Sequence, residues 1–371
     1  MRILYLLFTM LCFVRANTLL PPSDFLGYKL GDKFTPHHLV VDYLFHVSQN
    51  EPNVKIIEYG KTYEGRPLML AFISSVDNMD KLEQIRKDNL TRAGIIKGST
   101  KTKKVGIVWL SYNVHGNEAN STEAAMKTLH ALADKSNINT QEWLKNTVVI
   151  IDPSVNPDGR DRYANWYRMT ANRWPDADPL GLEHMEPWPG GRTNHYYFDL
   201  NRDWAWQTQI ESQQRIIKYN EWLPHIHVDF HEQGYNSPYF FAPAAKPLHQ
   251  YITDWQKDFQ KTIGLNHAKY FDRNNWLYFT KESFDLLYPS YGDTYPTYNG
   301  AIGMTYEQAG HSKGGLAIET EDGDTLTLAD RLEHHYTTGL STIEVASKNV
   351  EKMVNEFSDF FNPNRKELVD T

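Results

Sequence analysis

The sequence predicts an α/β fold in which helices flank a mixed, largely parallel central sheet. Its 371 residues suit one large domain with additions. Hydrophobic residues make up 40% of the chain and aromatic residues 13%, which is ample for a packed core. Apolar runs of strand length also alternate with segments of helical character, as in sheets that carry helices on both faces.

The elements of the N-terminal half can be placed in order along the chain. A helix is expected from about His37 to Gln49, because Thr35-Pro36 forms a start signal just before it. Apolar runs and helical patterns then alternate. The expected strands lie at about 54–59, 67–74, 104–112 and 147–152, and the expected helices near 79–88 and 121–135.

The second half begins with an irregular segment. Residues 171–198 are rich in Pro, Gly and Trp and have no period, and loops of this length are usually functional. A helix near 208–222 then leads into a strand within 224–234 that ends in polar residues. The segment 299–310 repeats that pattern, and a last amphipathic helix is expected over about 327–358.

The first residues predict export. Residues 1–16 have the pattern of a signal peptide, with Arg2, an apolar core of about eleven residues and Ala16 near a cleavage point. The core is too short for a membrane-spanning helix, which needs roughly 20 apolar residues. Cys12, the only cysteine, lies inside it. An exported chain without disulfides favours a bacterial protein, secreted or periplasmic, with no stable membrane insertion after signal removal.

The charge balance argues against two kinds of polyanionic partner. Without Arg2 and Arg15, 36 basic residues face 46 acidic ones, a net charge of about −10. Such a chain is repelled by nucleic acid and by anionic membrane surfaces.

Polar residues stand at the carboxyl ends of several predicted strands. His115 and Glu118 follow one strand, and His231 and Glu307 end two others. These ends converge in a parallel sheet. Two histidines and a glutamate form a typical catalytic zinc set with a position left for water. His115 and Glu118 alone are a weak signal, because Glu118 also lies where a helix favours an acid in its first turn.

Five motifs in order strengthen this interpretation, and they are "HGNE" (115–118), "NPDG" (156–159), "DLNRDW" (199–204), "DFHEQG" (229–234) and "GMTYEQAG" (303–310). Together they resemble the zinc carboxypeptidase family (the M14 metallopeptidases). The resemblance spans about 55–345, and the lead-in looks like that of large bacterial envelope members. It implies one zinc ion per chain, held by His115, Glu118 and His231. His225 and His227 share a strand face with His231, but only His231 lies at the strand's end inside the motif.

The resemblance also assigns the remaining roles. Glu307 matches the general base that takes a proton from the zinc-activated water. Asn201 and Arg202 look like the pair that binds the substrate's terminal carboxylate. Arg168 looks like the arginine that polarises the scissile carbonyl, although Arg160 and Arg162 lie close by.

Two substrate-binding assignments fall in a region where the alignment is uncertain. The family's mobile tyrosine is best matched by Tyr288, with Tyr291 as the alternative. The base of the side-chain pocket is best matched by Thr294, which is neutral and argues against a strict basic preference. Asp293 beside it would attract Lys or Arg if it faced the pocket, but it could equally cap a turn.

We therefore expect a zinc-dependent metallocarboxypeptidase whose substrates are peptides or proteins with a free C-terminus. The alternatives are an amidase acting on peptidoglycan stem peptides or γ-glutamyl amides, and an inactive zinc-binding module. The expected organisation is a lead-in over 17–55, a catalytic domain over 56–358 and a polar tail over 359–371. That tail either ends the protein or links it to a further C-terminal part.

Overall fold

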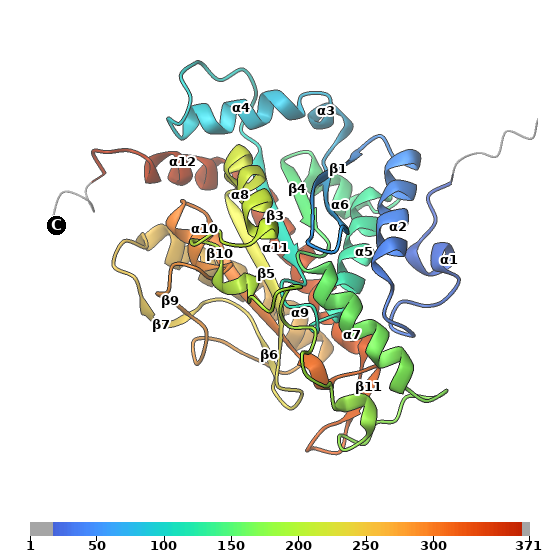
Figure 1. Ribbon diagram of the computed structural model, residues 1–371. Coiled ribbons are helices and arrows are strands. Elements are labelled where there is room, and N and C mark those ends of the chain that lie inside the picture. The colour runs from blue at the N-terminus through green and yellow to red at the C-terminus, as the bar shows by residue number, and fades with distance from the viewer. Residues whose placement is uncertain (1–17, 366–371) are drawn as a thin grey trace, which may run out of the picture.

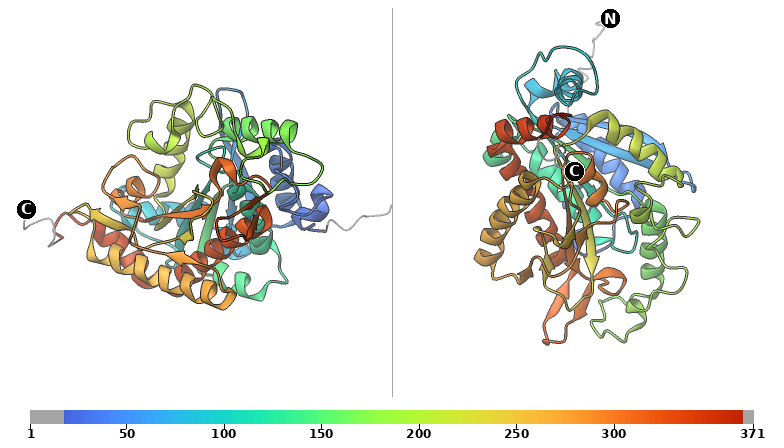
Figure 2. Two further views of the ribbon diagram at one scale, coloured as in Figure 1. Left: turned by 90° about the horizontal axis from the view of Figure 1, so that it is seen from below. Right: turned by 90° about the vertical axis from the view of Figure 1, so that its left-hand side faces the viewer.

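A computed structural model describes residues 18–365 of the chain. The expected signal peptide over 1–16 lies outside the described residues and stays a prediction. The described part is built around one eight-stranded sheet with helices on both faces (Figures 1 and 2). This arrangement confirms the predicted fold class.

The sheet is parallel at its centre, and antiparallel pairs join this centre to the outer strands on both sides. The central strands β4, β3, β5 and β10 run parallel, and β2 and β6 pair antiparallel with the outer two of them. In spatial order the strands are β1 (Val54–Lys61), β2 (Pro67–Ile73), β4 (Thr147–Asp152), β3 (Gly106–Tyr112), β5 (Ile226–Gln233), β10 (Ile302–Ala309), β6 (Tyr239–Phe240) and β8 (Tyr278–Phe279). Two small ribbons pair β7 (Ala245–Leu248) with β9 (Asp285–Leu286) and β11 (Ala317–Glu319) with β12 (Thr325–Thr327).

Helices cover the two faces of the sheet with separate cores (Figure 1). One face carries α2 (His37–Asn50), α5 (Asn120–Ala133), α9 (Asp254–Asn274) and α11 (Leu328–Lys348). The other carries α4 (Leu82–Arg92) and α8 (Ile210–Trp222). The remaining helical elements are α1 (Pro22–Leu26), α3 (Val76–Met79), α6 (Ile138–Leu144), α7 (Pro157–Thr170), α10 (Thr294–Tyr298), α12 (Val350–Phe360) and the 3₁₀ turns η1 (Leu182–His184), η2 (Leu200–Arg202) and η3 (His311–Lys313).

Side-chain alternation along the strands explains the two cores. In β3, Val108 and Leu110 point into the core beneath α5 and α11, whereas Ile107 and Trp109 point into the core beneath α4 and α8. Both faces of the central strands are therefore buried, as in parallel sheets generally. The apolar runs that predicted these strands are continuous for the same reason.

The predicted strands and helices are present in the structure, which also contains elements that were not predicted. The last helix is two helices, because α11 ends at Asn349 and α12 begins after it. Sequence patterns did not predict the helices α1, α6, α7, α9 and α10 or the short strands β6, β7, β8, β9, β11 and β12. Residues 171–198 are irregular as predicted, apart from the single 3₁₀ turn η1. Within residues 18–365, no helix combines the length and the apolar character that crossing a membrane requires.

Candidate metal and peptidase site

The turn between β3 and α5 presents His115 and Glu118 at the carboxyl edge of the sheet. Asn113 adopts a left-handed backbone conformation, with φ of 60°. Its side-chain amide donates to the carbonyl oxygens of His115 at 2.9 Å and of Glu118 at 3.0 Å, which holds the turn together. A Cβ atom at Gly116 would lie 2.2 Å from the backbone nitrogen of Arg160, so only glycine permits this close approach to α7.

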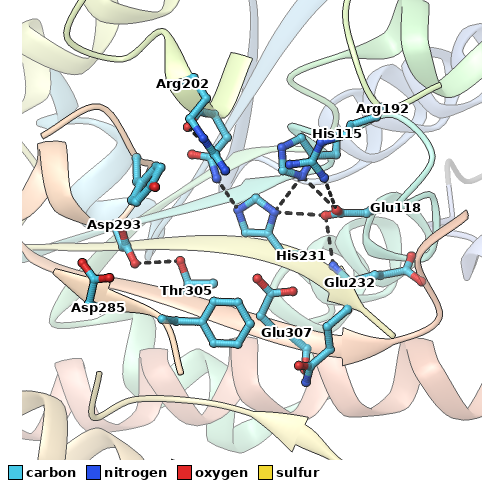
Figure 3. Close-up of a pocket in the computed structure, with 14 residues that line it drawn as sticks. His115, Glu118, Arg192, Arg202, His231, Glu232, Asp285, Asp293, Thr305 and Glu307 are labelled. Atoms are coloured by element: carbon cyan, nitrogen blue, oxygen red, sulfur yellow. Dashed lines mark hydrogen bonds and ion pairs between the residues drawn. The ribbon is translucent and has the colours of Figure 1, made fainter. Parts of the chain in front are cut away.

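Three buried side chains meet at this edge, as Figure 3 shows. The Nδ1 atom of His115 lies 2.8 Å from Oε1 of Glu118, and Nδ1 of His231 lies 3.0 Å from Oε2 of the same carboxylate. The two Nδ1 atoms are 3.2 Å apart. One ligand atom from each residue falls within 4.8 Å of the others. Two imidazole nitrogens converging on one carboxylate form the donor set that zinc takes, so these residues fit the ion.

The charge state of Glu118 suits a ligand. Burial alone favours the protonated carboxyl, but the neighbouring His115 and His231 rings hold the pKa of Glu118 well below its ordinary value. The carboxylate is therefore ionised and available to a cation.

Each histidine also contacts a second carboxylate through its other ring nitrogen. The Nε2 atom of His115 lies 3.0 Å from Oδ1 of Asp199, and Nε2 of His231 lies 2.8 Å from Oδ2 of Asp229. The His231 contact is close enough for an ion pair, although it does not meet the geometry of a hydrogen bond. Carboxylates in such positions fix the ring and leave Nδ1 free to bind a metal. Sequence analysis did not single out Asp199 or Asp229.

Glu307 faces the same three residues from the adjacent strand. It pairs with His231 in the parallel register of β10 and β5, and its side chain points into the pocket (Figure 3). Burial raises the pKa of Glu307 well above its ordinary value, the positive His231 ring opposes that rise, and the Glu118 carboxylate reinforces it. A carboxylate with a raised pKa next to a candidate metal-binding site is suited to accept a proton.

Asn201 and Arg202 lie on the wall of the same pocket, on the turn η2. The side chain of Asp199 accepts a hydrogen bond from the Asn201 backbone at 2.9 Å and so caps this turn. The side-chain oxygen of Asn201 accepts from the Gly292 backbone at 2.7 Å. The Cζ atom of Arg202 lies 4.5 Å from the ring centre of Tyr291, a cation–π contact that orients the guanidinium.

Arg168 lies outside this pocket. It is exposed on α7, and its guanidinium donates to the carbonyl oxygen of Phe34 at 2.9 Å. Arg192, from the irregular loop, lines the pocket instead (Figure 3). It reaches Oε1 of Glu118 at 3.4 Å and Oδ2 of Asp199 at 3.0 Å. Sequence analysis missed Arg192 because the loop has no period. The sequence feature that could have pointed to Arg192 is its position nine residues before Asn201.

The structure also separates the two candidate tyrosines. Tyr291 lines the pocket beside Arg202, whereas Tyr288 is exposed at the rim and accepts a hydrogen bond from Nε1 of Trp206 at 2.9 Å. Their rings contact each other, with centres 4.9 Å apart. The structure therefore places the alternative candidate, Tyr291, next to Arg202.

Asp293 faces the pocket and Thr294 does not. Thr294 is fully buried, and its hydroxyl donates to Oδ1 of Asp293 at 2.8 Å. Thr305 donates to Oδ2 of Asp293 at 2.9 Å. Burial raises the pKa of Asp293, and these two hydroxyl contacts only partly oppose that rise. Asp285 lines the same end of the pocket (Figure 3), so this end is acidic.

Comparisons with known proteins agree with this geometry. The sequence model of the zinc carboxypeptidase family matches residues 40–267. No curated protein matches the chain. A metallo-carboxypeptidase from Burkholderia cenocepacia is 15% identical, with 85% of this chain and 68% of that chain covered and a TM-score of 0.54.

Two further solved structures are similar to this chain. A metallo-carboxypeptidase from Pseudomonas aeruginosa, in complex with (2-guanidinoethylmercapto)succinic acid, is 12% identical over 85% of this chain and 68% of that chain, with a TM-score of 0.56. Carboxypeptidase A from Helicoverpa armigera is 17% identical over 90% of this chain and 79% of that chain, also with a TM-score of 0.56. At these identities the likeness to solved structures establishes a shared fold.

Proposed function

The chain belongs to the zinc carboxypeptidase family, and we propose that it removes residues one at a time from the free carboxyl end of peptides. One observation carries the proposal. A single cavity of about 420 Å³ joins the three metal-binding candidates, Glu307 and the pair Asn201 and Arg202. A peptide end can therefore reach a carboxylate-binding arginine and the reacting groups at the same time.

Glu307 moves the proton in this proposal. Bound zinc supplies Lewis acidity, which polarises a carbonyl and makes water a stronger nucleophile at neutral pH. The Glu307 carboxylate accepts the proton of the attacking water and passes it to the leaving amine nitrogen. The peptide bond is thereby replaced by a carboxylic acid and an amine, which become a carboxylate and an ammonium group by exchange of a proton, and Glu307 returns to its starting state.

Two arginines bind different parts of the substrate in this proposal, Arg202 the terminal carboxylate and Arg192 the scissile carbonyl oxygen. The Arg202 guanidinium, held over Tyr291, offers paired donors to the terminal carboxylate. Arg192 lies against Glu118, so we assign to it the role of stabilising negative charge on the scissile carbonyl oxygen. This assignment replaces Arg168, whose side chain is engaged with Phe34.

The acidic end of the pocket supports acceptance of basic residues. Asp293 and Asp285 lie where the last side chain of a substrate would enter, and Asp293 has no cationic partner among the described residues. A Lys or Arg side chain would supply that partner. The Pseudomonas aeruginosa protein was solved with a guanidino compound, which is consistent with a basic ligand in this fold. We expect mixed specificity in which basic ends are accepted.

Three peptides that differ only at their last residue test the proposal. The zinc-loaded protein is incubated with peptides ending in Arg, in Phe and in amidated Phe, and the products are read by mass spectrometry. We expect stepwise shortening of the first two and resistance of the amidated peptide, because Arg202 would face an uncharged end. Equal cleavage of the amidated peptide, or internal cuts, would contradict the assignment of the clamp.

A further inference from the structure

A third histidine, His311, lies beside the metal-binding candidates. Its Nε2 atom is 3.8 Å from Oε1 of Glu118, which lines the pocket, and its side chain remains about one-third exposed. Figure 3 shows Asp285 and Asp293 at one end of the pocket, Glu118 and Arg192 at the other, and His231 and Glu307 between them. His311 contacts Glu118 and therefore lies at the end away from Asp293.

The backbone at His311 is held in an unfavourable conformation. Its φ is 51°, in the left-handed region that non-glycine residues seldom adopt. The preceding Gly310 has φ of 144°, and a Cβ atom there would lie 2.2 Å from Oε2 of Glu232. Residues in such conformations persist where the surroundings force them, and they concentrate at functional sites.

Buried polar contacts hold the turn on both sides of His311. Oε2 of Glu232 forms a fully buried ion pair with Arg331 at 2.9 Å, and Arg331 also donates to the carbonyl oxygen of Gly315. The backbone nitrogen of Gly310 donates to Gln233 at 3.0 Å, and that of Gly314 donates to Gly310 at 3.0 Å. The turn that carries His311 is therefore tied to β5 and to α11.

The imidazole has one engaged nitrogen and one free nitrogen. Nδ1 lies 3.1 Å from the hydroxyl of Ser312. No hydrogen bond joins Nε2 to any other residue within 18–365, and 3.8 Å to Glu118 is too long for one. In the tautomer in which Ser312 donates to Nδ1, the ring proton sits on Nε2, on the side of the ring toward Glu118.

We propose that His311 binds the part of the substrate upstream of the scissile bond, with Nε2–H donating to a backbone carbonyl oxygen there. The inference rests on the proposed function, which sets the direction of the chain. A substrate whose last residue lies between Arg202 and Asp293 has its scissile bond near His231 and Glu307. The remaining chain must then leave past Glu118, where His311 and Arg192 stand.

The experiment compares two ligands with one variant. Asparagine tolerates the left-handed backbone but is too short to reach the rim, so His311→Asn removes the donor without changing the turn. The first ligand is a pentapeptide with a free carboxyl end, and its dissociation constant is measured by calorimetry in the zinc-loaded Glu307→Gln background. The second is (2-guanidinoethylmercapto)succinic acid, which offers carboxylates but no upstream peptide unit. Lys313→Ala, on the same turn, is the matched control.

We expect His311→Asn to weaken pentapeptide binding by roughly 2- to 12-fold, the value of one neutral hydrogen bond. The affinity for (2-guanidinoethylmercapto)succinic acid, the zinc content and the melting temperature should not change. Lys313→Ala should bind both ligands as the Glu307→Gln protein does. Equal weakening of both ligands, loss of zinc, or no change for the pentapeptide would each overturn the inference. Failure of the wild-type protein to cleave the pentapeptide would instead contradict the proposed function, and this inference with it.

Discussion

The pocket has two halves that are positioned in different ways. The strand-borne half consists of His115, Glu118, His231 and Glu307, which end or follow the parallel strands β3, β5 and β10. Sheet register fixes this half, for example by pairing Glu307 with His231. The loop-borne half consists of Arg192, Asn201, Arg202 and Tyr291. Polar contacts such as the bond from Gly292 to Asn201 fix that half.

The difference indicates a division of labour. The strand-borne residues are buried in a rigid sheet edge, which suits groups that must hold an ion and move a proton within tight geometry. We assign substrate binding to the loop-borne residues, and loops that carry such groups vary more readily than the elements that support them. Substitutions in the two halves should therefore have effects of different kinds.

The largest effect is expected from Glu307→Gln in the strand-borne half. The variant keeps the shape of the side chain but cannot accept a proton, so turnover should fall by about 10²- to 10⁴-fold. Zinc content and melting temperature should stay at wild-type values, since Glu307 is not a proposed ligand. Steady-state kinetics with metal analysis measures both. Near-normal turnover would show that another group is the base.

The next largest effect separates two arginines. Arg192→Ala should reduce kcat by about 10²- to 10³-fold, because it removes a donor aimed at developing negative charge. Arg168→Ala is the matched control, and it should leave kcat unchanged because Arg168 contacts Phe34. If the two variants behaved in the opposite way, the original sequence-based assignment would stand and the structural one would fail.

The site residues at strand ends could be predicted from the sequence, whereas those on loops could not. Residues at strand ends could be placed in advance, because an apolar run followed by polar residues locates the carboxyl edge of a sheet. The structure brings all four such residues together. Loop residues could not be placed this way. Between Arg168 and Asn201 the chain has no period, so spacing alone could not tell Arg168 from Arg192.

The elements of the fold, like the site residues, were predicted only in part from the sequence. The continuous apolar runs predicted the four strands of the parallel centre within a few residues. The break between α11 and α12 was missed, because the amphipathic pattern continues past Asn349 while the backbone leaves the helical conformation there. Thr294 was preferred to Asp293 by alignment, but only the backbone path of α10 decides which side chain faces the pocket.

A smaller effect compares the carboxylates behind the two histidines. Asp229 lies on strand β5 and Asp199 lies on the loop before η2. Asp229→Asn and Asp199→Asn should each weaken zinc affinity by about 10- to 100-fold. We expect the greater loss for Asp229, whose side chain is 1% exposed against 21% for Asp199. Competition with a chelator measures the two affinities. Unchanged affinity in both variants would mean that these contacts do not orient the rings.

The smallest effect on kinetics is expected beside Arg202. Tyr291→Leu removes the ring that orients Arg202 and should raise KM by about 2- to 5-fold, the value of an exposed cation–π contact. Tyr288→Leu should change KM less, since Tyr288 contacts Trp206 at the rim. A larger effect from Tyr288 would identify it as the residue that closes on the substrate.

The central claim is that His115, Glu118 and His231 form the zinc centre of a carboxypeptidase. Titration of zinc into metal-free protein, with bound metal and peptide cleavage measured on the same samples, tests it most directly. The account predicts one zinc per chain and activity that rises in proportion to zinc bound, with His231→Ala failing on both measures. Full activity in the metal-free wild type, or no zinc binding at all, would contradict it.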